Sequence, residues 1–347
     1  MDPSVYIPAY LERTYLASHP ELTDAARELV HNDVSVNPHK YAQTEHAQAL
    51  LSYAGVHRHL LDELHRIEDM GSDEEFEQTR NRLFDDMRDE LLKIVRVDAL
   101  AVDAQLLAII LADTPVEACL GDLMKLEATT ADYLQQSVPG FDMEAPHYWA
   151  NKVLTDSVTA ADLTVSEPAL IGWLHTLEAI SQLCMASARY RAAANYARRV
   201  LKAEGYPTRA AGTVLLALAR LEDQDGFFAL AHQLEEEIGA DALENSPWYL
   251  LARTILLFKT NKMRPATRAL REFANRCEGG AFFLLNPMYQ TPYLPCRPEP
   301  RDPWDLSHQA VWEADGIISD TPDFAPWANA CEDVSQLAQE FARRYGF

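Results

Sequence analysis

The 347-residue chain carries 53 acidic against 30 basic side chains, which gives a formal net charge of −23. A surface this negative repels the phosphate backbone of nucleic acids and anionic lipid headgroups, so the composition argues against nucleic-acid and membrane-surface binding. Only 13 glycines occur, and alanine, leucine, glutamate and arginine dominate, which favours an all-α protein.

Residues 1–97 predict an N-terminal helical region. The opening residues contain no basic segment followed by an apolar run, so no signal peptide is expected. Residues 1–44 predict a short helix with loops, and residues 45–66 predict a helix with apolar side chains at helical spacing. Ser72 and Glu75 then form a capping box, which opens the next helix.

A helical hairpin is predicted over residues 98–136. Residues 99–112 are almost entirely apolar, which predicts a helix buried on most sides. The apolar stretch 106–112 is far shorter than the ~20 residues of a membrane-spanning helix. With no signal peptide and with scattered cysteines that suit a reducing compartment, a cytoplasmic protein is expected. Pro115 suits the first turn of a second helix, 115–136, which the short connection makes antiparallel to the first.

Three further hairpins are predicted over residues 169–280, after an irregular connector at 137–168. Their second helices begin with a large apolar residue at Tyr190, Phe227 and Met263, and a small or aliphatic residue follows one turn later. The intervals of 37 and 36 residues are close to the ~34 residues of a tetratricopeptide (TPR) unit. The pattern predicts a TPR-like α-α superhelix, a solenoid in which stacked hairpins share a continuous core.

Residues 281–347 predict a proline-rich strap followed by a cap. Six prolines fall between residues 286 and 303, too many for a helix interior, which indicates an extended segment over the preceding hairpins. Two closing helices are expected at 305–318 and 332–344, where they cap the end of the solenoid.

Four sequence elements occur in an order typical of one bacterial family. They are AVDAQLLAIILADTPVEA at 101–118, HYW at 147–149, LLNPMYQTPYLPCRP at 284–298 and TPDFAPW at 321–327. On these elements, the run from Val102 onward resembles the TPR proteins of the suppressor-of-tumorigenicity type. The chain departs from that pattern at Ser166, where SEPAL replaces a threonine-arginine-proline-tyrosine run. The resemblance implies a TPR-like scaffold and brings no catalytic residues to this sequence.

No motif in the sequence predicts a catalytic, cofactor or metal site. There is no HExxH, GxSxG or glycine-rich phosphate loop. The five cysteines are scattered and never spaced as CxxC, which favours free thiols over a disulfide framework or a cysteine zinc site. The alternative is a zinc site assembled from several helices by the early histidines. These histidines are His39, His46, His57, His59 and His65.

The predicted binding residues are aromatic and basic side chains on the first helices of the hairpins. First helices line the concave surface of stacked TPR hairpins, and tryptophan and arginine are common interface anchors. The groove is therefore expected to contain Trp173, Arg220, Trp248 and Arg253. The two arginines, about one repeat apart, suit a carboxylate or an acidic peptide. The alternatives are that the tryptophans belong to the inter-repeat core and that the arginines pair with neighbouring glutamates.

The leading hypothesis from the sequence is a non-enzymatic scaffold that binds a peptide or protein segment in the concave groove. Repeats offer a long preformed surface at low ordering cost, which favours this function. One alternative is an enzyme with a site between the N-terminal histidine-containing helices and the repeats. Another is a structural component that only forms oligomers. None of these hypotheses includes a cofactor, a nucleic acid or a membrane.

Overall fold

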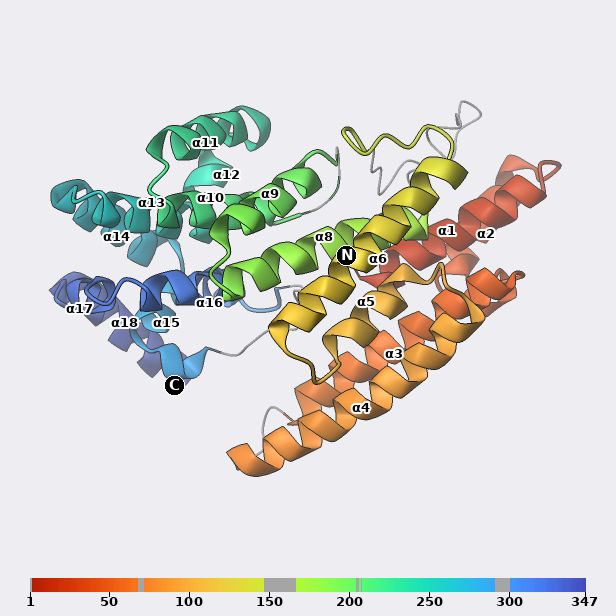
Figure 1. The fold of residues 1–347 in the computed structure, drawn as a ribbon, viewed down its shortest axis with the longest axis horizontal. Helices are drawn as coiled ribbons and strands as arrows, with labels where there is room; N and C mark the ends of the chain where they lie inside the picture. The colour runs from red at the N-terminus through yellow and green to blue at the C-terminus, as the bar shows by residue number, and fades with distance from the viewer. Residues whose placement is uncertain (1, 68–71, 147–166, 204–205, 207, 291–299) are drawn as a thin grey trace. The chain divides into compact units, whose positions relative to one another are not determined.

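The computed structural model describes the chain except residues 1, 68–71, 147–166, 204–205, 207 and 291–299. Over the described residues it contains 17 α-helices, two short 3₁₀-helices and no strand (Figure 1), which confirms the all-α class. The chain forms two compact units, and the division falls inside helix α8, between Leu177 and Glu178. Unit 1 comprises residues 1–177 and 202–207, and unit 2 comprises residues 178–201 and 208–347.

Unit 1 contains six helices and the first part of a seventh. Adjacent helices pack in pairs, with α3 on α4, α4 on α5 and α5 on α6. The region before α3 is more helical than predicted, because Asp2 and Thr23 cap two helices where one was expected. The helices are α1 (Pro3–Ser18), α2 (Asp24–Val34), α3 (Glu45–Ile67), α4 (Asp73–Val97), α5 (Val102–Ile110), α6 (Val116–Ser137) and α8 (Pro168–Ala186).

Local sequence signals explain how the helices of unit 1 begin and which faces they bury. The Ser72 hydroxyl accepts a hydrogen bond from the Glu75 backbone N–H at 3.5 Å, which is the serine half of the predicted capping box. The predicted apolar stripe of α4 is buried at Met87, Leu91 and Ile94. In α5, six of nine residues are buried, which agrees with the near absence of a polar face in its sequence.

Unit 2 contains the remaining helices. In it α9 packs on α10, α10 on α13 and α13 on α14, while α15 packs on α18. Both predicted closing helices, at 305–318 and 332–344, are present as α16 and α18. The bounds are α9 (Tyr190–Leu201), α10 (Ala210–Arg220), α11 (Gln224–Ile238), α12 (Ala240–Glu244), α13 (Pro247–Lys259), α14 (Met263–Arg276), α15 (Gly280–Leu285), α16 (Asp305–Ser319), α17 (Phe324–Asn329) and α18 (Glu332–Tyr345).

Three helical hairpins of unit 2 share one turn. Each turn has a non-glycine residue in the left-handed region, with φ of 58° at Ala188, 58° at Glu222 and 56° at Asn261. In each, the next backbone N–H reaches back to the carbonyl five residues earlier, which is the bond of a Schellman motif. These bonds are Arg189 N–H to Cys184 O (2.7 Å), Asp223 N–H to Leu218 O (3.1 Å) and Lys262 N–H to Leu257 O (2.9 Å).

The shared turn corrects the sequence alignment of the middle hairpin. Counted from the turns, Phe227 is equivalent to Ala193 and Ala266, and all three side chains are fully buried. The sequence alignment paired Phe227 with Tyr190 and was therefore shifted by three residues. The interval between turns is 34 residues from Ala188 to Glu222 and 39 residues from there to Asn261. The five-residue helix α12, inserted between α11 and α13, matches the longer interval.

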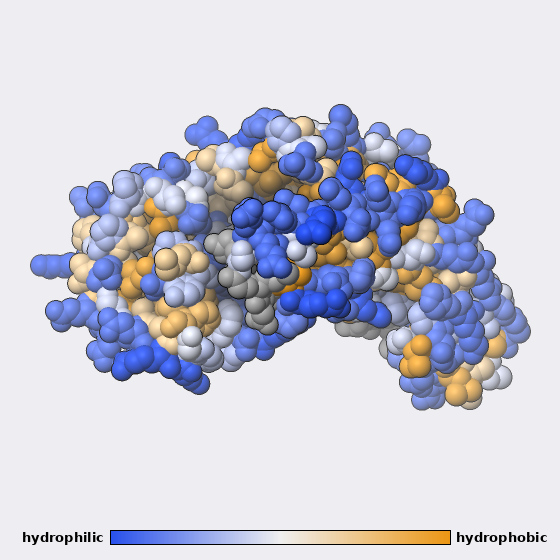
Figure 2. All heavy atoms as spheres, turned by 90° about the horizontal axis from the view of Figure 1, so that it is seen from below, coloured by the Kyte–Doolittle hydropathy of each residue, from blue (hydrophilic) through white to orange (hydrophobic). Residues whose placement is uncertain are grey.

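Half of the proline-rich segment predicted as a strap, residues 291–299 of 286–303, lies outside the described residues. Just before them, Pro287–Tyr289 form a 3₁₀-helix. Hydrophilic side chains cover most of the surface in view in Figure 2, with apolar residues in scattered groups, as expected from the strongly acidic composition.

Candidate functional site

The two tryptophans predicted as anchors lie in the interior. In unit 1, Trp173 is fully buried, and its indole N–H donates to Glu127 Oε1 at 2.9 Å. In unit 2, Trp248 is 5% exposed, and its indole N–H donates to Glu313 Oε2 at 2.9 Å. Both rings therefore contribute to packing in the core of their units, and a contact with a partner stays a prediction.

The two predicted arginines each bind an acidic side chain of unit 2. Arg220 Nη2 lies 3.3 Å from Asp320 Oδ2, and its guanidinium lies over the Tyr190 ring, 5.3 Å from the centroid. Arg253 Nη1 lies 3.0 Å from Glu272 Oε2. Both side chains are about one third exposed. They are partly neutralised, so the expected wall of two free cations is replaced by two surface ion pairs.

The face made by the first helices α10 and α13 is covered by the chain's own helix α16. α10 packs along α13, and α16 packs against both. The covered side of α16 carries apolar side chains at Ala310, Val311, Ala314 and Ile317, and all four are buried. We call the surface of α10 and α13 under α16 the first-helix face.

Two buried polar side chains of α16 bind this first-helix face. Gln309, 1% exposed, accepts a hydrogen bond from Arg209 Nη1 at 2.5 Å. Glu313, one helical turn later, accepts from Trp248 Nε1 at 2.9 Å and from the Thr213 hydroxyl at 3.4 Å. The donors come from α13, from α10 and from the residue before α10. The two acceptors of α16 are therefore hydrogen-bonded by side chains at both first helices.

A glycine allows the two first helices to approach closely at this point. A Cβ built on Gly212 of α10 lies 2.4 Å from Cγ of Trp248, closer than real side-chain carbons approach each other. Any larger residue therefore displaces the indole whose N–H binds Glu313. Gly212 and the Gln309–Glu313 pair were missed from the sequence, although two polar residues on an apolar helix stripe are a signal that could have identified α16.

The early histidines of unit 1 have separate environments. His39, His59 and His65 are exposed. His57 is 8% exposed, and burial lowers its pKa, although Asp2 and Asp103 act in the opposite direction. Among the described residues, no group of three or more histidine, cysteine or acidic side chains could hold a metal ion.

His46 forms a polar pair with an aspartate from a different helix end. Its Nδ1 lies 2.5 Å from Asp98 Oδ2, directly after α4. The His46 ring also contacts the Tyr10 ring edge-on, with centroids 5.6 Å apart.

A second polar network in unit 1 is fully buried. His175 Nδ1 lies 2.8 Å from Asp103 Oδ1, and the Tyr6 hydroxyl donates to Asp103 Oδ2 at 2.6 Å. Burial opposes ionisation of Asp103, yet His175 and the two hydrogen bonds keep the pKa of its carboxyl below the ordinary value. This network joins α1, α5 and α8 within unit 1.

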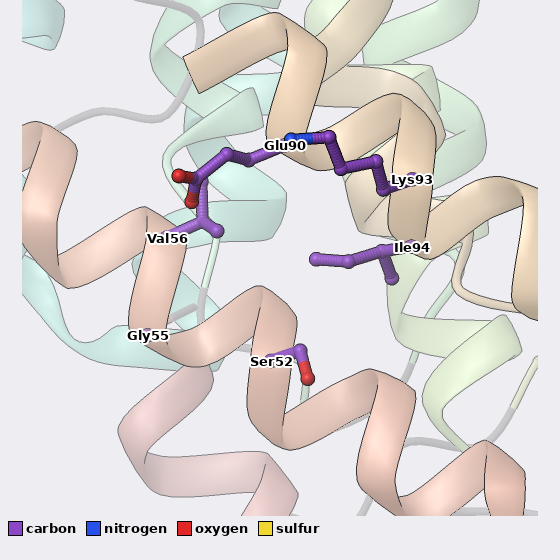
Figure 3. A pocket seen from close by; sticks show the side chains of 6 residues that line it. All are labelled: Ser52, Gly55, Val56, Glu90, Lys93 and Ile94. Atoms are coloured by element: carbon purple, nitrogen blue, oxygen red, sulfur yellow. The ribbon is translucent and has the colours of Figure 1, made fainter. Parts of the chain in front are cut away.

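An open pocket of about 470 Å³ lies between α3 and α4 (Figure 3). Ser52, Gly55 and Val56 line it from α3, and Glu90, Lys93 and Ile94 line it from α4. The Ser52 hydroxyl donates to the Gln48 carbonyl of its own helix at 2.9 Å. The lining brings together a single acid and a single base and no arrangement of nucleophile and base, so the pocket defines no chemistry.

No family model, no curated protein and no solved structure matches the chain. The resemblance to the suppressor-of-tumorigenicity TPR proteins therefore stays a prediction. Across the described residues, none of the helices has the length and apolar content required to cross a membrane.

Proposed function

We propose that this chain is a non-enzymatic, TPR-like helical-repeat scaffold that binds a helical segment of a partner protein on its first-helix face. Three hairpins with the same turn and the packing of α10 on α13 support the repeat assignment. Stacked hairpins hold such a face in place before binding, so little conformational entropy is lost when a partner arrives.

The observation that carries the proposal is the packing of α16 on the first-helix face. Its Gln309 and Glu313 lie one turn apart, and Arg209, Thr213 and Trp248 bind them. A helix without these acceptors leaves buried donors unsatisfied, which costs about 1–3 kcal/mol for each group. The face therefore favours an amphipathic helix that presents an amide and a carboxylate at positions i and i+4.

A partner of this kind competes with α16. A segment of the same chain binds intramolecularly, at an effective concentration far above that of a micromolar free partner. A free helix at micromolar concentration is therefore excluded unless it binds far more tightly or α16 is weakened in its seat.

The test uses the full chain and a fluorescent peptide with the sequence of residues 305–319. Weakening α16 with the double substitution Gln309→Ala and Glu313→Ala should expose the face. Fluorescence anisotropy should then show that the double variant binds the peptide with a Kd at least about tenfold lower than the Kd of the unchanged protein. Adding Arg209→Ala should reverse this gain.

A peptide with the same two alanines is the matched control, and it should bind neither protein. Equal binding of both peptides, or no binding to the weakened variant while its helix content and melting curve stay intact, contradicts the proposal.

A further inference from the structure

A group of six titratable side chains converges in unit 1 from three helices and from the residues next to two others. All six side chains are partly exposed. Their mutual electrostatic influence extends across the group, from the α1 side chains to the residue before α8. They are Tyr10 and Arg13 of α1, His46 of α3, Asp98 after α4, Tyr133 of α6 and Glu167 before α8.

Arg13 is the unusual member of this group. Its Nη1 is buried and has no hydrogen-bond partner in the part of the chain that the structure describes. Burial lowers the pKa of Arg13, although Glu167 and Tyr10 oppose this effect. A guanidinium offers five N–H donors in a planar fork, and burying one without an acceptor carries a desolvation cost. The geometry therefore leaves a donor available at this position.

His46 is a second oriented donor. Asp98 fixes the ring through Nδ1, and the Leu100 backbone N–H in turn donates to Asp98 Oδ1 at 2.9 Å. A carboxylate bound at one ring nitrogen sets the tautomer and the direction of the other. Because Nδ1 is engaged, Nε2 is the nitrogen that can face a ligand.

Glu167 is the one carboxylate of the group that no histidine or arginine binds directly among the described residues. Burial raises its pKa, although His46, Arg13 and a hydrogen bond from the Ala169 backbone act in the opposite direction. Burial also raises the pKa of Tyr10 and of Tyr133, and the charge of Glu167 adds to both shifts. The two hydroxyls therefore keep their protons and remain donors at neutral pH.

We propose that this cluster binds a small oxyanion, a carboxylate or a phosphate group, with Arg13 as its principal contact and His46 and Tyr10 as further donors. The donors outnumber the free acceptors, because Asp98 is occupied by His46. Bidentate binding of such groups is what the guanidinium fork favours. The site is independent of the first-helix face, which lies in unit 2.

Binding should strengthen as the pH falls. An ionised Glu167 repels an anion, and its protonation removes that repulsion and adds one more donor. The groups that influence Glu167 from the surrounding elements are Arg13 and Tyr10 of α1, His46 of α3 and Tyr133 of α6.

The test is isothermal titration of the full chain with sodium phosphate and, separately, with sodium acetate at constant ionic strength. Arg13→Gln should weaken binding about tenfold or more, and Arg13→Lys should weaken it less, because a cation remains. The matched control, Arg58→Gln, changes an exposed arginine of α3 and should leave the affinity unchanged. Preference for phosphate or acetate identifies which oxyanion the site accepts.

Glu167→Gln keeps the shape of the site and removes its charge. Affinity at pH 8 should rise, and the strengthening of binding as the pH falls should shrink. If Arg13→Gln fails to fold, the affinities of Arg13→Lys and Glu167→Gln for the anion test the proposal instead. Neither anion binding the unchanged protein, or equal affinity in the Arg58 and Arg13 variants, overturns the proposal.

Discussion

Glu313 in unit 2 and Arg13 in unit 1 are both charged groups held between helices, and they differ in their partners. Glu313 accepts hydrogen bonds from Trp248 and Thr213. Arg13 has a buried nitrogen with no acceptor in the described part of unit 1. Removing an ion from water costs several kcal/mol unless its partners replace the lost hydration. The Oε2 atom of Glu313 has donors on two helices and so fixes how they pack, whereas the buried Nη1 of Arg13 has no acceptor among the described residues.

The same contrast exists within unit 1. Asp103 is bound by Tyr6 and His175 and is 4% exposed, whereas Arg13 is partly exposed and lacks such bonds. Both groups belong to unit 1, so stability measurements on one fold can compare them. Replacing a satisfied group should cost much stability, and replacing an unsatisfied one should cost little.

The largest expected effect is that of Asp103→Ala. The change removes the acceptor of two buried donors and leaves His175 and Tyr6 without it, which typically costs about 3–5 kcal/mol. The measurement is urea-induced unfolding followed by circular dichroism. Arg13→Gln is the comparison, with an expected change within about 0.5 kcal/mol. A loss of similar size in both variants contradicts the distinction between satisfied and unsatisfied groups.

Ala266→Leu tests the packing of the repeated hairpins. Ala266 is fully buried against Leu257 and Ala269, with Phe258 and Trp327 beside them. Three added carbon atoms have no space there, and overpacking of this kind costs about 1–3 kcal/mol. The midpoint of thermal unfolding should therefore fall clearly. A change at the exposed Glu236 should leave it unaltered, and equal midpoints for both variants would show that this crossing tolerates bulk.

A smaller, pH-dependent effect is expected from His57. Burial places the pKa of the folded state below the unfolded value near 6.5. Between these two values the unfolded chain binds more protons, so stability falls as the pH falls, by at most about 1.4 kcal/mol per pH unit. Unfolding free energies measured from pH 7 to pH 5 should show this slope. The slope should be smaller in the His57→Gln variant. If it is unchanged there, groups other than His57 cause the pH dependence.

Helix positions followed from the sequence because they depend on local signals. Apolar spacing and proline punctuation located α16 and α18, and the Ser72 cap located the start of α4. The middle hairpin was misaligned because Phe227 occupies a position that alanine fills in its neighbours. A large residue there resembles the large residue that opens the other second helices.

The sites did not follow from the sequence because their contacts join distant residues. Arg209 and Gln309 are 100 positions apart, and His46 and Asp98 are 52 positions apart. Such pairs are set by tertiary packing, which periodicity does not specify. Nor did the sequence indicate that the chain's own helix α16 covers the first-helix face on which binding was predicted.

A small effect on stability is expected from Arg220→Ala with Arg253→Ala. Both arginines form partly exposed ion pairs, with Asp320 and Glu272. Exposed pairs contribute about 0–1 kcal/mol each, and the contact of Arg220 with the Tyr190 ring adds about 0.5–1 kcal/mol. The double variant should therefore melt only slightly below the unchanged protein. High salt should narrow the remaining gap, because it screens exposed pairs.

The same double variant separates two roles for these arginines. If they anchor an acidic partner, cross-linking of that partner to unit 2 should be lost while the melting curve stays nearly intact. If they are structural ties, cross-linking should survive and the melting temperature should fall. Arg220 ties α10 to the residue after α16, so the second outcome would also assign it a part in holding α16 on the first-helix face. Peptide 305–319 should then bind the Arg220→Ala protein more readily than the Arg253→Ala protein, since only Arg220 contacts the end of α16.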